Sequence, residues 1–138
     1  MTVSEIMTPD PLTVGREDTL LNALDLMVQN GIHELPVMDG SSLVGIITER
    51  DLRSALGKGV RTVDERVMDE ARLEAAVGDW MATDVEAIYP ETTISEAARL
   101  LAMLRVGSLP VVDGEEQLVG ILSVTDLLVY IAERLEAE

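Results

Sequence analysis

The sequence predicts an α+β fold built from two pseudo-symmetric copies of one β-α-β-β-α unit, packed as a pair. Three observations predict it. The chain of 138 residues repeats itself, with about 18 identities over about 50 aligned positions and one inserted residue near Glu116. Each copy has one stretch of helical apolar periodicity, followed by two short apolar runs. In both copies an Asp-Gly pair separates those runs, which is typical of a hairpin.

The repeat is carried by anchor residues that keep the same order in both copies. The anchors are Met7 with Met81, Asp10 with Asp84, Thr19 with Thr93, Leu26 with Leu100, Leu-Pro-Val at 35–37 and 109–111, and Asp51 with Asp126. We therefore divide the chain into a first motif (1–57), a linker (58–76) and a second motif (77–138). Because each half is too short to bury a large core, each is expected to need the other.

The elements of the first copy follow from its local patterns. A short segment ends at Met7, and an extended stretch covers Leu12–Val14. Apolar residues then recur at helical spacing over 20–28, and Gly31 is placed to end this helix. Two strands over 35–38 and 43–47 follow, and a second helix begins near Thr48.

The second copy repeats this order. The expected elements are an extended stretch at 86–88, a helix from Ile94, strands at 109–112 and 118–122, and a helix from about Ser123. Thr93 and Glu96 predict a capping box at the start of the first of these helices. The charged linker stretch Asp64–Glu74 is interpreted as a helix with a solvated face.

Composition narrows the classes of partner and chemistry. A net charge of −16 argues against nucleic acid or an anionic membrane as the main partner, because both require basic patches. There is no apolar run long enough to span a membrane. The absence of cysteine excludes disulfides and thiolate chemistry, and a single histidine excludes a histidine-based metal cluster. These features favour a cytoplasmic location.

The corner between the second strand and the second helix is the sharpest motif. It reads Gly45-Ile46-Ile47-Thr48-Glu49-Arg50-Asp51 in one copy and Gly120-Ile121-Leu122-Ser123-Val124-Thr125-Asp126 in the other. The glycine allows close approach of another group to the backbone. The hydroxyl at a helix start is suited to a phosphate, and the aspartate can accept two hydrogen bonds from a ribose diol. The alternative is that Ser/Thr-x-x-Asp only caps the helix. The two roles can coexist.

The repeated Leu-Pro-Val-x-Asp strand, the Gly-x-x-Thr/Ser-x-x-Asp corner and the opening Ile6-Met7-Thr8 resemble a tandem pair of cystathionine-β-synthase (CBS) domains, also called a Bateman module. The resemblance implies a regulatory module that binds an adenine nucleotide (AMP, ADP or ATP), S-adenosylmethionine or NAD. It also implies a homodimer and an effector protein that reads the ligand. ATP would require Mg²⁺ to offset repulsion by the acidic chain. Because the pattern occupies the chain, we expect no enzymatic activity.

The resemblance also implies two crossed sites. In site one, Asp126 would hold the ribose and the hydroxyls of Ser123 and Thr125 the phosphate, with Leu12 and Ile32 beside adenine and His33 within reach of a phosphate. Site two would join Thr48, Arg50 and Asp51 to Glu86, Val106 and Gly107, with Ile46 and Ile121 beside the two corners. Glu86 places a carboxylate beside the base, which disfavours adenine in site two, whereas Arg50 favours a phosphate. For His33 a purely structural role is the alternative.

Three expectations concern surfaces. Trp80 is expected to pack in the core, with base stacking as the alternative. The dimer is expected to use apolar helical residues, which are Ala97, Ala98, Leu101, Ala102, Leu104, Ile131 and Leu135. The second hypothesis for function is an interaction scaffold of the same fold that dimerises without a small ligand.

Overall fold

The computed structural model describes residues 1–56 and 74–137. The chain forms two compact units, one over Leu12–Asp84 and one made of Met1–Pro11 with Val85–Glu138. Each unit combines a small sheet with helices, which confirms the predicted α+β class. The sequence stretch Asp64–Leu73, which carries most of the expected linker helix, lies outside the described residues.

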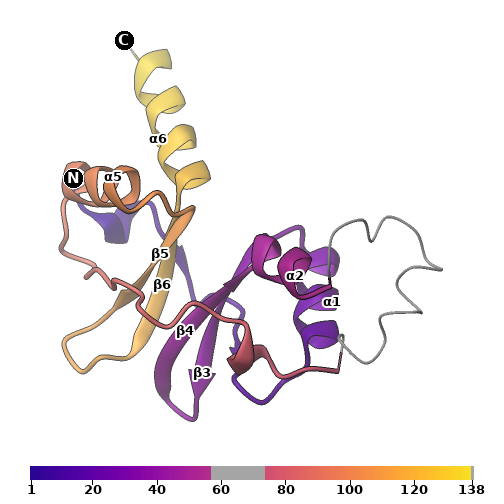
Figure 1. The fold of residues 1–138 in the computed structure, drawn as a ribbon. Coiled ribbons are helices and arrows are strands. Elements are labelled where there is room, and N and C mark those ends of the chain that lie inside the picture. Colours follow the sequence, from indigo (N-terminus) through magenta and orange to yellow (C-terminus); the bar gives the residue numbers. More distant parts are fainter. Residues whose placement is uncertain (57–73, 138) are drawn as a thin grey trace. The chain divides into compact units, whose positions relative to one another are not determined.

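The Leu12–Asp84 unit has a three-stranded sheet in the order β2-β3-β4 (Figure 1). Its elements are β2 (Val14–Gly15), α1 (Leu20–Asn30), β3 (Glu34–Asp39), β4 (Ser42–Thr48), α2 (Glu49–Leu56) and a short 3-10 helix, η2 (Val77–Asp79). The β3–β4 pair is the predicted antiparallel hairpin, and β2 runs parallel to β3. The expected extended stretch from Leu12 pairs only at its end, where Val14 lies opposite Val37.

One face of this sheet carries the core of the unit. Both α1 and α2 bury their apolar sides against it, and the fully or nearly buried core residues include Leu20, Ala23, Met27, Leu35, Val37, Ile47, Leu52 and Ala55. Alternate residues of β3, Leu35 and Val37, face this core, as the period of a strand requires. These side chains are aliphatic or methionine, and the whole chain contains no phenylalanine. Burial of their apolar surface therefore holds the unit together.

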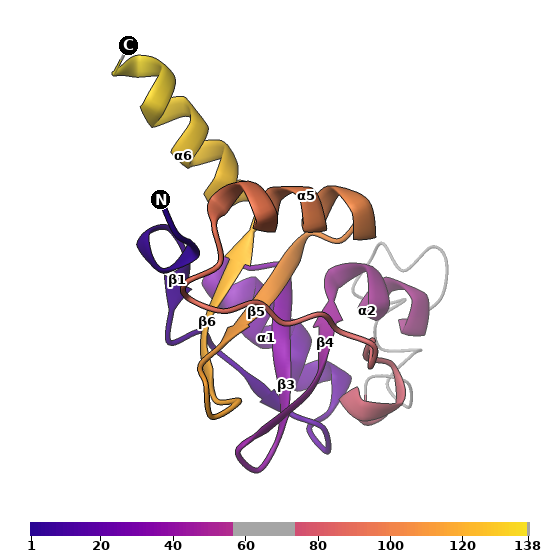
Figure 2. The same ribbon diagram turned by 90° about the vertical axis from the view of Figure 1, so that its left-hand side faces the viewer.

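The second unit repeats the plan with a sheet in the order β1-β6-β5 (Figure 2). Its elements are η1 (Val3–Glu5), β1 (Thr8–Pro9), α5 (Ile94–Leu104), β5 (Ser108–Val112), β6 (Leu118–Ser123) and α6 (Val124–Glu136). Both views show α6 continuing beyond the sheet (Figures 1 and 2). Ala97 and Leu101 are core residues of this unit, so their expected place in a dimer surface is wrong. They lie on the side of α5 that packs on the sheet.

Each unit takes its short opening segment from the other sequence repeat. Strand β1, from the first repeat, pairs with β6 of the second, and Ala82, from the second repeat, bridges Ile46 of the first. A Cβ atom on Gly45 would lie 2.6 Å from the carbonyl oxygen of Ala82, and one on Gly120 would lie 2.5 Å from Sδ of Met7. The close approach that these glycines permit is therefore already used by the chain itself.

Caps and turns define where the helices and hairpins end. Gly31 ends α1 as predicted, with φ 62°. At the start of α5, the Thr93 hydroxyl accepts a hydrogen bond from the backbone N–H of Glu96, which is the half of the predicted capping box that the structure shows. In the second hairpin the positive φ falls at the inserted residue, Glu116, and not at Gly114. There the Asp113 carboxylate accepts bonds from two backbone N–H groups.

Candidate functional site

The two corner motifs have the same geometry in both units. In the first, the backbone N–H of Thr48 donates to Oδ2 of Asp51 at 2.9 Å, and the N–H of Asp51 donates back to the Thr48 hydroxyl at 3.2 Å. In the second, Ser123 and Asp126 make the same pair of bonds at 2.9 and 3.1 Å. The capping role that the sequence left open is therefore present at both corners.

Capping leaves part of each corner available. In both boxes the hydroxyl oxygen accepts a bond, so its own proton can still be donated. Only Oδ2 of each aspartate takes part, and within the described residues Oδ1 of Asp51 and of Asp126 has no hydrogen-bond partner. Both aspartates are half-buried. An ordered carboxylate oxygen beside a donor hydroxyl is the arrangement that a ribose with a neighbouring phosphate would require.

Each unit supplies residues to both predicted sites. The Leu12–Asp84 unit holds the site-two corner (Thr48, Arg50 and Asp51) and the site-one residues Leu12, Ile32 and His33. The other unit holds the site-one corner (Ser123, Thr125 and Asp126) and Glu86, Val106 and Gly107. Site one and site two each combine residues of both units, so the crossed arrangement stays a prediction.

Within each unit, the backbone joins the corner of one predicted site to the strand start of the other. The N–H of Glu49 donates to the carbonyl oxygen of His33 at 2.8 Å, and the N–H of Val124 donates to that of Gly107 at 3.0 Å. A shift of α2 or α6 would therefore move a strand start as well. Neither bond was predicted from the sequence.

The candidate residues differ in exposure. Leu12 is 47% exposed and Val106 41%, so each presents an apolar side chain for a base to contact. Thr125, Arg50, Glu86 and Gly107 are also exposed, whereas Ile32 and Ile121 are half-buried. Ile46 is 6% exposed, which leaves little of its side chain for a ligand.

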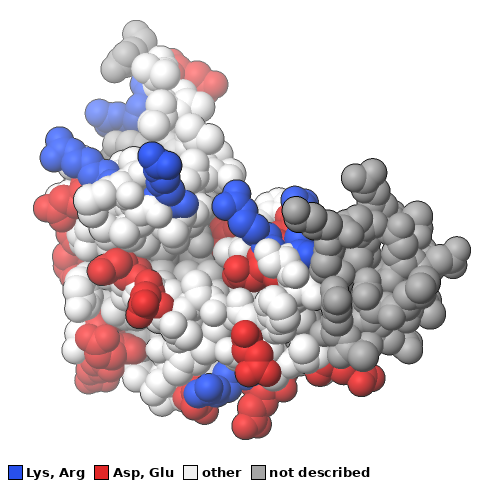
Figure 3. Space-filling view, viewed as in Figure 1, with Lys and Arg blue, Asp and Glu red and all other residues white. Residues whose placement is uncertain are grey.

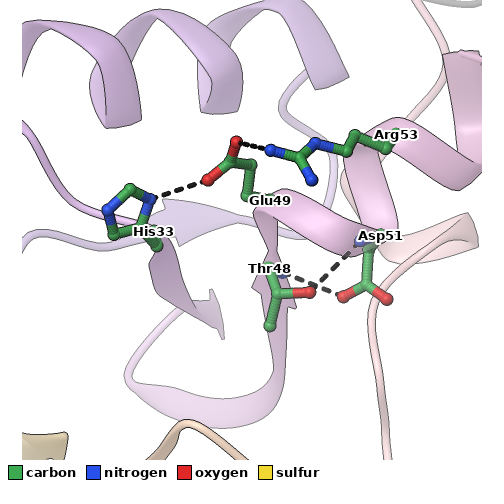
Figure 4. A network of polar contacts seen from close by, with 5 residues as sticks. All are labelled: His33, Thr48, Glu49, Asp51 and Arg53. Carbon is green, nitrogen blue, oxygen red and sulfur yellow. Dashed lines mark hydrogen bonds and ion pairs between the residues drawn. The ribbon is translucent and has the colours of Figure 1, made fainter. Parts of the chain in front are cut away.

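Figure 4 shows a polar network at the start of α2 that the sequence analysis missed. The Glu49 carboxylate lies between His33, with Nδ1 2.7 Å from Oε2, and Arg53, whose guanidinium donates to Oε1 at 2.5 Å. The hydrogen bond from His33, and after it the bond from Arg53, hold the pKa of Glu49 below its ordinary value. The i,i+4 spacing of Glu49 and Arg53 was the available signal.

Each unit also has a shallow cavity where its 3-10 segment meets its second helix. One, of about 320 Å³, is lined by Ser54, Ala55, Ala75 and Trp80. The other, of about 290 Å³, is lined by Met1, Glu5, Ile6, Tyr130, Glu133 and Arg134. Trp80 is 41% exposed, so its predicted packing in the core is wrong. Met81 packs against the core in its place.

The acidic composition of the chain is visible on its described surface. On the face shown in Figure 3, acidic side chains are spread widely and arginines lie among them without forming one large basic patch. Among the described residues, no cluster of three or more histidine or acidic side chains could hold a metal ion, and no helix is long and apolar enough to cross a membrane.

Comparison with known proteins places the chain in a family. The model of the CBS domain matches residues 3–58 and 77–133. A CBS domain-containing protein of Dictyostelium discoideum is 35% identical over 136 residues, which cover 97% of this chain and 93% of that protein. An inosine-5'-monophosphate dehydrogenase of Methanocaldococcus jannaschii is 34% identical over 125 residues, which cover 90% of this chain but 22% of the enzyme.

A solved structure extends this likeness to three dimensions. The crystal structure of CBSX2, a CBS-pair protein of Arabidopsis thaliana, in complex with AMP is 30% identical, with a TM-score of 0.77 and 98% of both chains covered. The likeness therefore covers nearly the whole chain and includes the order of the elements along it. The chain belongs to the CBS domain family and carries two CBS domains in tandem.

Proposed function

We propose that this chain is a regulatory module that binds an adenosyl ligand, with AMP or ADP preferred, and is not itself an enzyme. The observation that carries the proposal is the corner box present in both units, which leaves an aspartate oxygen and a hydroxyl proton available. The AMP complex of CBSX2, which is 30% identical, supports the same ligand class. S-Adenosylmethionine and NAD are the other adenosyl ligands that these groups would suit.

The proposed binding mode is crossed. In site one the Asp126 carboxylate accepts the ribose hydroxyls, the hydroxyls of Ser123 and Thr125 donate to a phosphate, and Leu12 and Ile32 contact the base. Site two uses Thr48, Arg50 and Asp51 with Val106 and Gly107, and is weaker for adenine because of the Glu86 carboxylate. With a net charge of −16, the chain disfavours a triphosphate unless Mg²⁺ accompanies it.

The proposed mechanism is a population shift. A ligand that binds one arrangement of the two units, or of a homodimer, more tightly than another raises the population of that arrangement, and an effector protein of the cell reads the difference. The hydrogen bonds that join His33 to Glu49 and Gly107 to Val124 give such a shift a path within each unit. A cytoplasmic location fits a free nucleotide as the signal.

Calorimetric titration with AMP, ADP, ATP with and without Mg²⁺, S-adenosylmethionine and NAD tests the proposal. We expect AMP or ADP to bind more tightly than metal-free ATP, and neither DNA nor anionic vesicles to bind. In a parallel melting assay, a ligand at about 100 times its Kd adds about 2.7 kcal/mol of stability. Metal-free ATP binding much more tightly than AMP would refute the charge argument.

A second candidate is a scaffold that dimerises without a small ligand. The observation that favours it is the apolar side of α6, where Val124, Leu128, Ile131 and Leu135 are 41–63% exposed. The same titrations separate the two candidates, because a scaffold would give no heat of binding with any adenosyl compound. Sedimentation would still detect its dimer.

A further inference from the structure

The network around Glu49 is like an anion-binding site in which the bound anion is the Glu49 carboxylate itself. The carboxylate contacts a group on each side, Nδ1 of His33 at 2.7 Å and the Arg53 guanidinium at 2.5 Å. Arginine is always charged, and a histidine ring nitrogen can donate a hydrogen bond to an anion. Two groups suited to binding an anion are therefore gathered on one negative charge that belongs to the chain itself.

The two basic groups remain accessible from solvent. The side chains of His33 and Arg53 are 75% and 76% exposed, whereas that of Glu49 is 38% exposed. An incoming anion can therefore reach both groups without any movement of the core. It has only to replace the Glu49 carboxylate, whose bonds are to exposed partners and thus exchange readily with solvent.

Only one unit has this arrangement. The positions that correspond to His33, Glu49 and Arg53 in the second unit are Gly107, Val124 and Leu128, which carry no ionisable group. The backbone hydrogen bond is nevertheless the same in both units. The N–H of residue 49 donates to the carbonyl oxygen of residue 33, and the N–H of residue 124 donates to that of residue 107. The polar network is thus not needed to start the helix, since α6 begins in the same way without it.

We propose that Glu49 is a built-in competitor for the phosphate of the ligand, one that lowers the affinity for phosphorylated adenosyl compounds relative to unphosphorylated ones. This inference rests on the proposed function and adds a regulation to it. The phosphate displaces the Glu49 carboxylate from His33 and Arg53. Because Glu49 directly follows Thr48 in the corner box, the displacement also acts on the start of α2.

The test compares AMP with adenosine, which lacks the phosphate, on three proteins by calorimetry. Glu49→Gln keeps the size of the side chain but removes its charge. Asp39→Asn is the matched control, because it removes one charge from another exposed ion pair of the same unit, with Arg16 at 3.5 Å. We expect Glu49→Gln to tighten AMP by about fivefold or more, with adenosine changed less than about twofold, and Asp39→Asn to leave both unchanged.

A second readout uses the single histidine of the chain. Its ring signals in an NMR spectrum belong to His33 without further assignment, and we expect AMP to shift them more than adenosine does. Arg53→Gln, which removes a cation, is expected to weaken AMP and to spare adenosine.

The outcomes separate the two proposals. If AMP and adenosine bind but their ratio is the same in wild type and Glu49→Gln, the competitor role is wrong and the proposed function stands. If no adenosyl compound binds to either protein, the proposed function fails and the competitor role fails with it. An equal gain in Asp39→Asn would show a general effect of net charge and overturn the specific role of Glu49.

Discussion

Gly31 and Arg105 occupy the same position in the two repeats and end their helices in the same left-handed conformation. Gly31, after α1, has φ 62° and ψ 35°, and Arg105, after α5, has φ 56° and ψ 41°. The N–H of each closes the last turn, on Met27 and Leu101 respectively. A left-handed backbone costs little at glycine and about 1–2 kcal/mol at other residues.

Arg105→Gly is therefore expected to raise the free energy of unfolding by about 0.5–1 kcal/mol. This is the relief of backbone strain minus the cost of the greater freedom that glycine gives the unfolded chain. Urea denaturation measures this change. The reverse substitution, Gly31→Arg, is expected to destabilise by a similar amount. A loss of stability in Arg105→Gly would mean that the arginine side chain makes a stabilising contact that outweighs its backbone strain.

Gly45→Ala is expected to destabilise by about 1–3 kcal/mol, because overpacking forces the backbone to move. The added Cβ would lie 2.6 Å from the carbonyl oxygen of Ala82, which a strand bridge holds in place. Gly107→Ala is the control, since its Cβ would meet nothing within 4 Å, and it should change stability by less than about 0.5 kcal/mol. Thermal melting of both variants distinguishes the packing role of Gly45 from a general preference for glycine.

Asp126→Ala and Asp51→Ala are expected to cost the same stability but different ligand affinity. Each removes one capping box of nearly identical geometry, so each should lose about 1 kcal/mol. Loss of a charged hydrogen bond to ribose should also weaken AMP by about 10–100-fold in Asp126→Ala and by less in Asp51→Ala. Equal losses of affinity would mean that the asymmetry assigned to Glu86 is wrong.

Glu49 is expected to stabilise the protein at neutral pH and not in acid. His33 and Arg53 hold its folded pKa below the ordinary 4.5, so its contribution is present above pH 4.5 and is lost as the pH falls through the folded pKa. Melting of wild type and Glu49→Gln between about pH 7 and about pH 3 measures this. We expect wild type to be the more stable at pH 7 and the difference to shrink in acid. A constant difference would contradict the pairing.

Leu128→Arg is expected to weaken a homodimer, because it places a charge within the exposed apolar side of α6. Glu133→Arg introduces the same residue on the opposite side of the helix and should leave the association unchanged. Sedimentation at micromolar concentration and high salt measures the mass. Monomeric wild type under these conditions would refute the dimer.

Much of the fold could be predicted because the sequence pattern occurs twice in the chain. Helical spacing over 20–28, the Asp-Gly pair at residue 39 and Gly31 each specify local structure through contacts between near neighbours. The hydroxyl and aspartate of each corner are likewise three residues apart, so their capping role was visible in the sequence. What the sequence could not decide was whether capping leaves Oδ1 available.

The sequence alone determined the repeat, the α+β class, the helix and hairpin positions and the corner motifs, because these rest on local spacing. Other features depended on residues far apart in the chain. Only the tertiary structure decided that Met7 packs at Gly120, that Trp80 is exposed and that Glu49 joins His33 to Arg53. The physical reason is that a side chain's neighbours across a sheet or between segments are fixed by the packing of the whole unit, which no local pattern encodes.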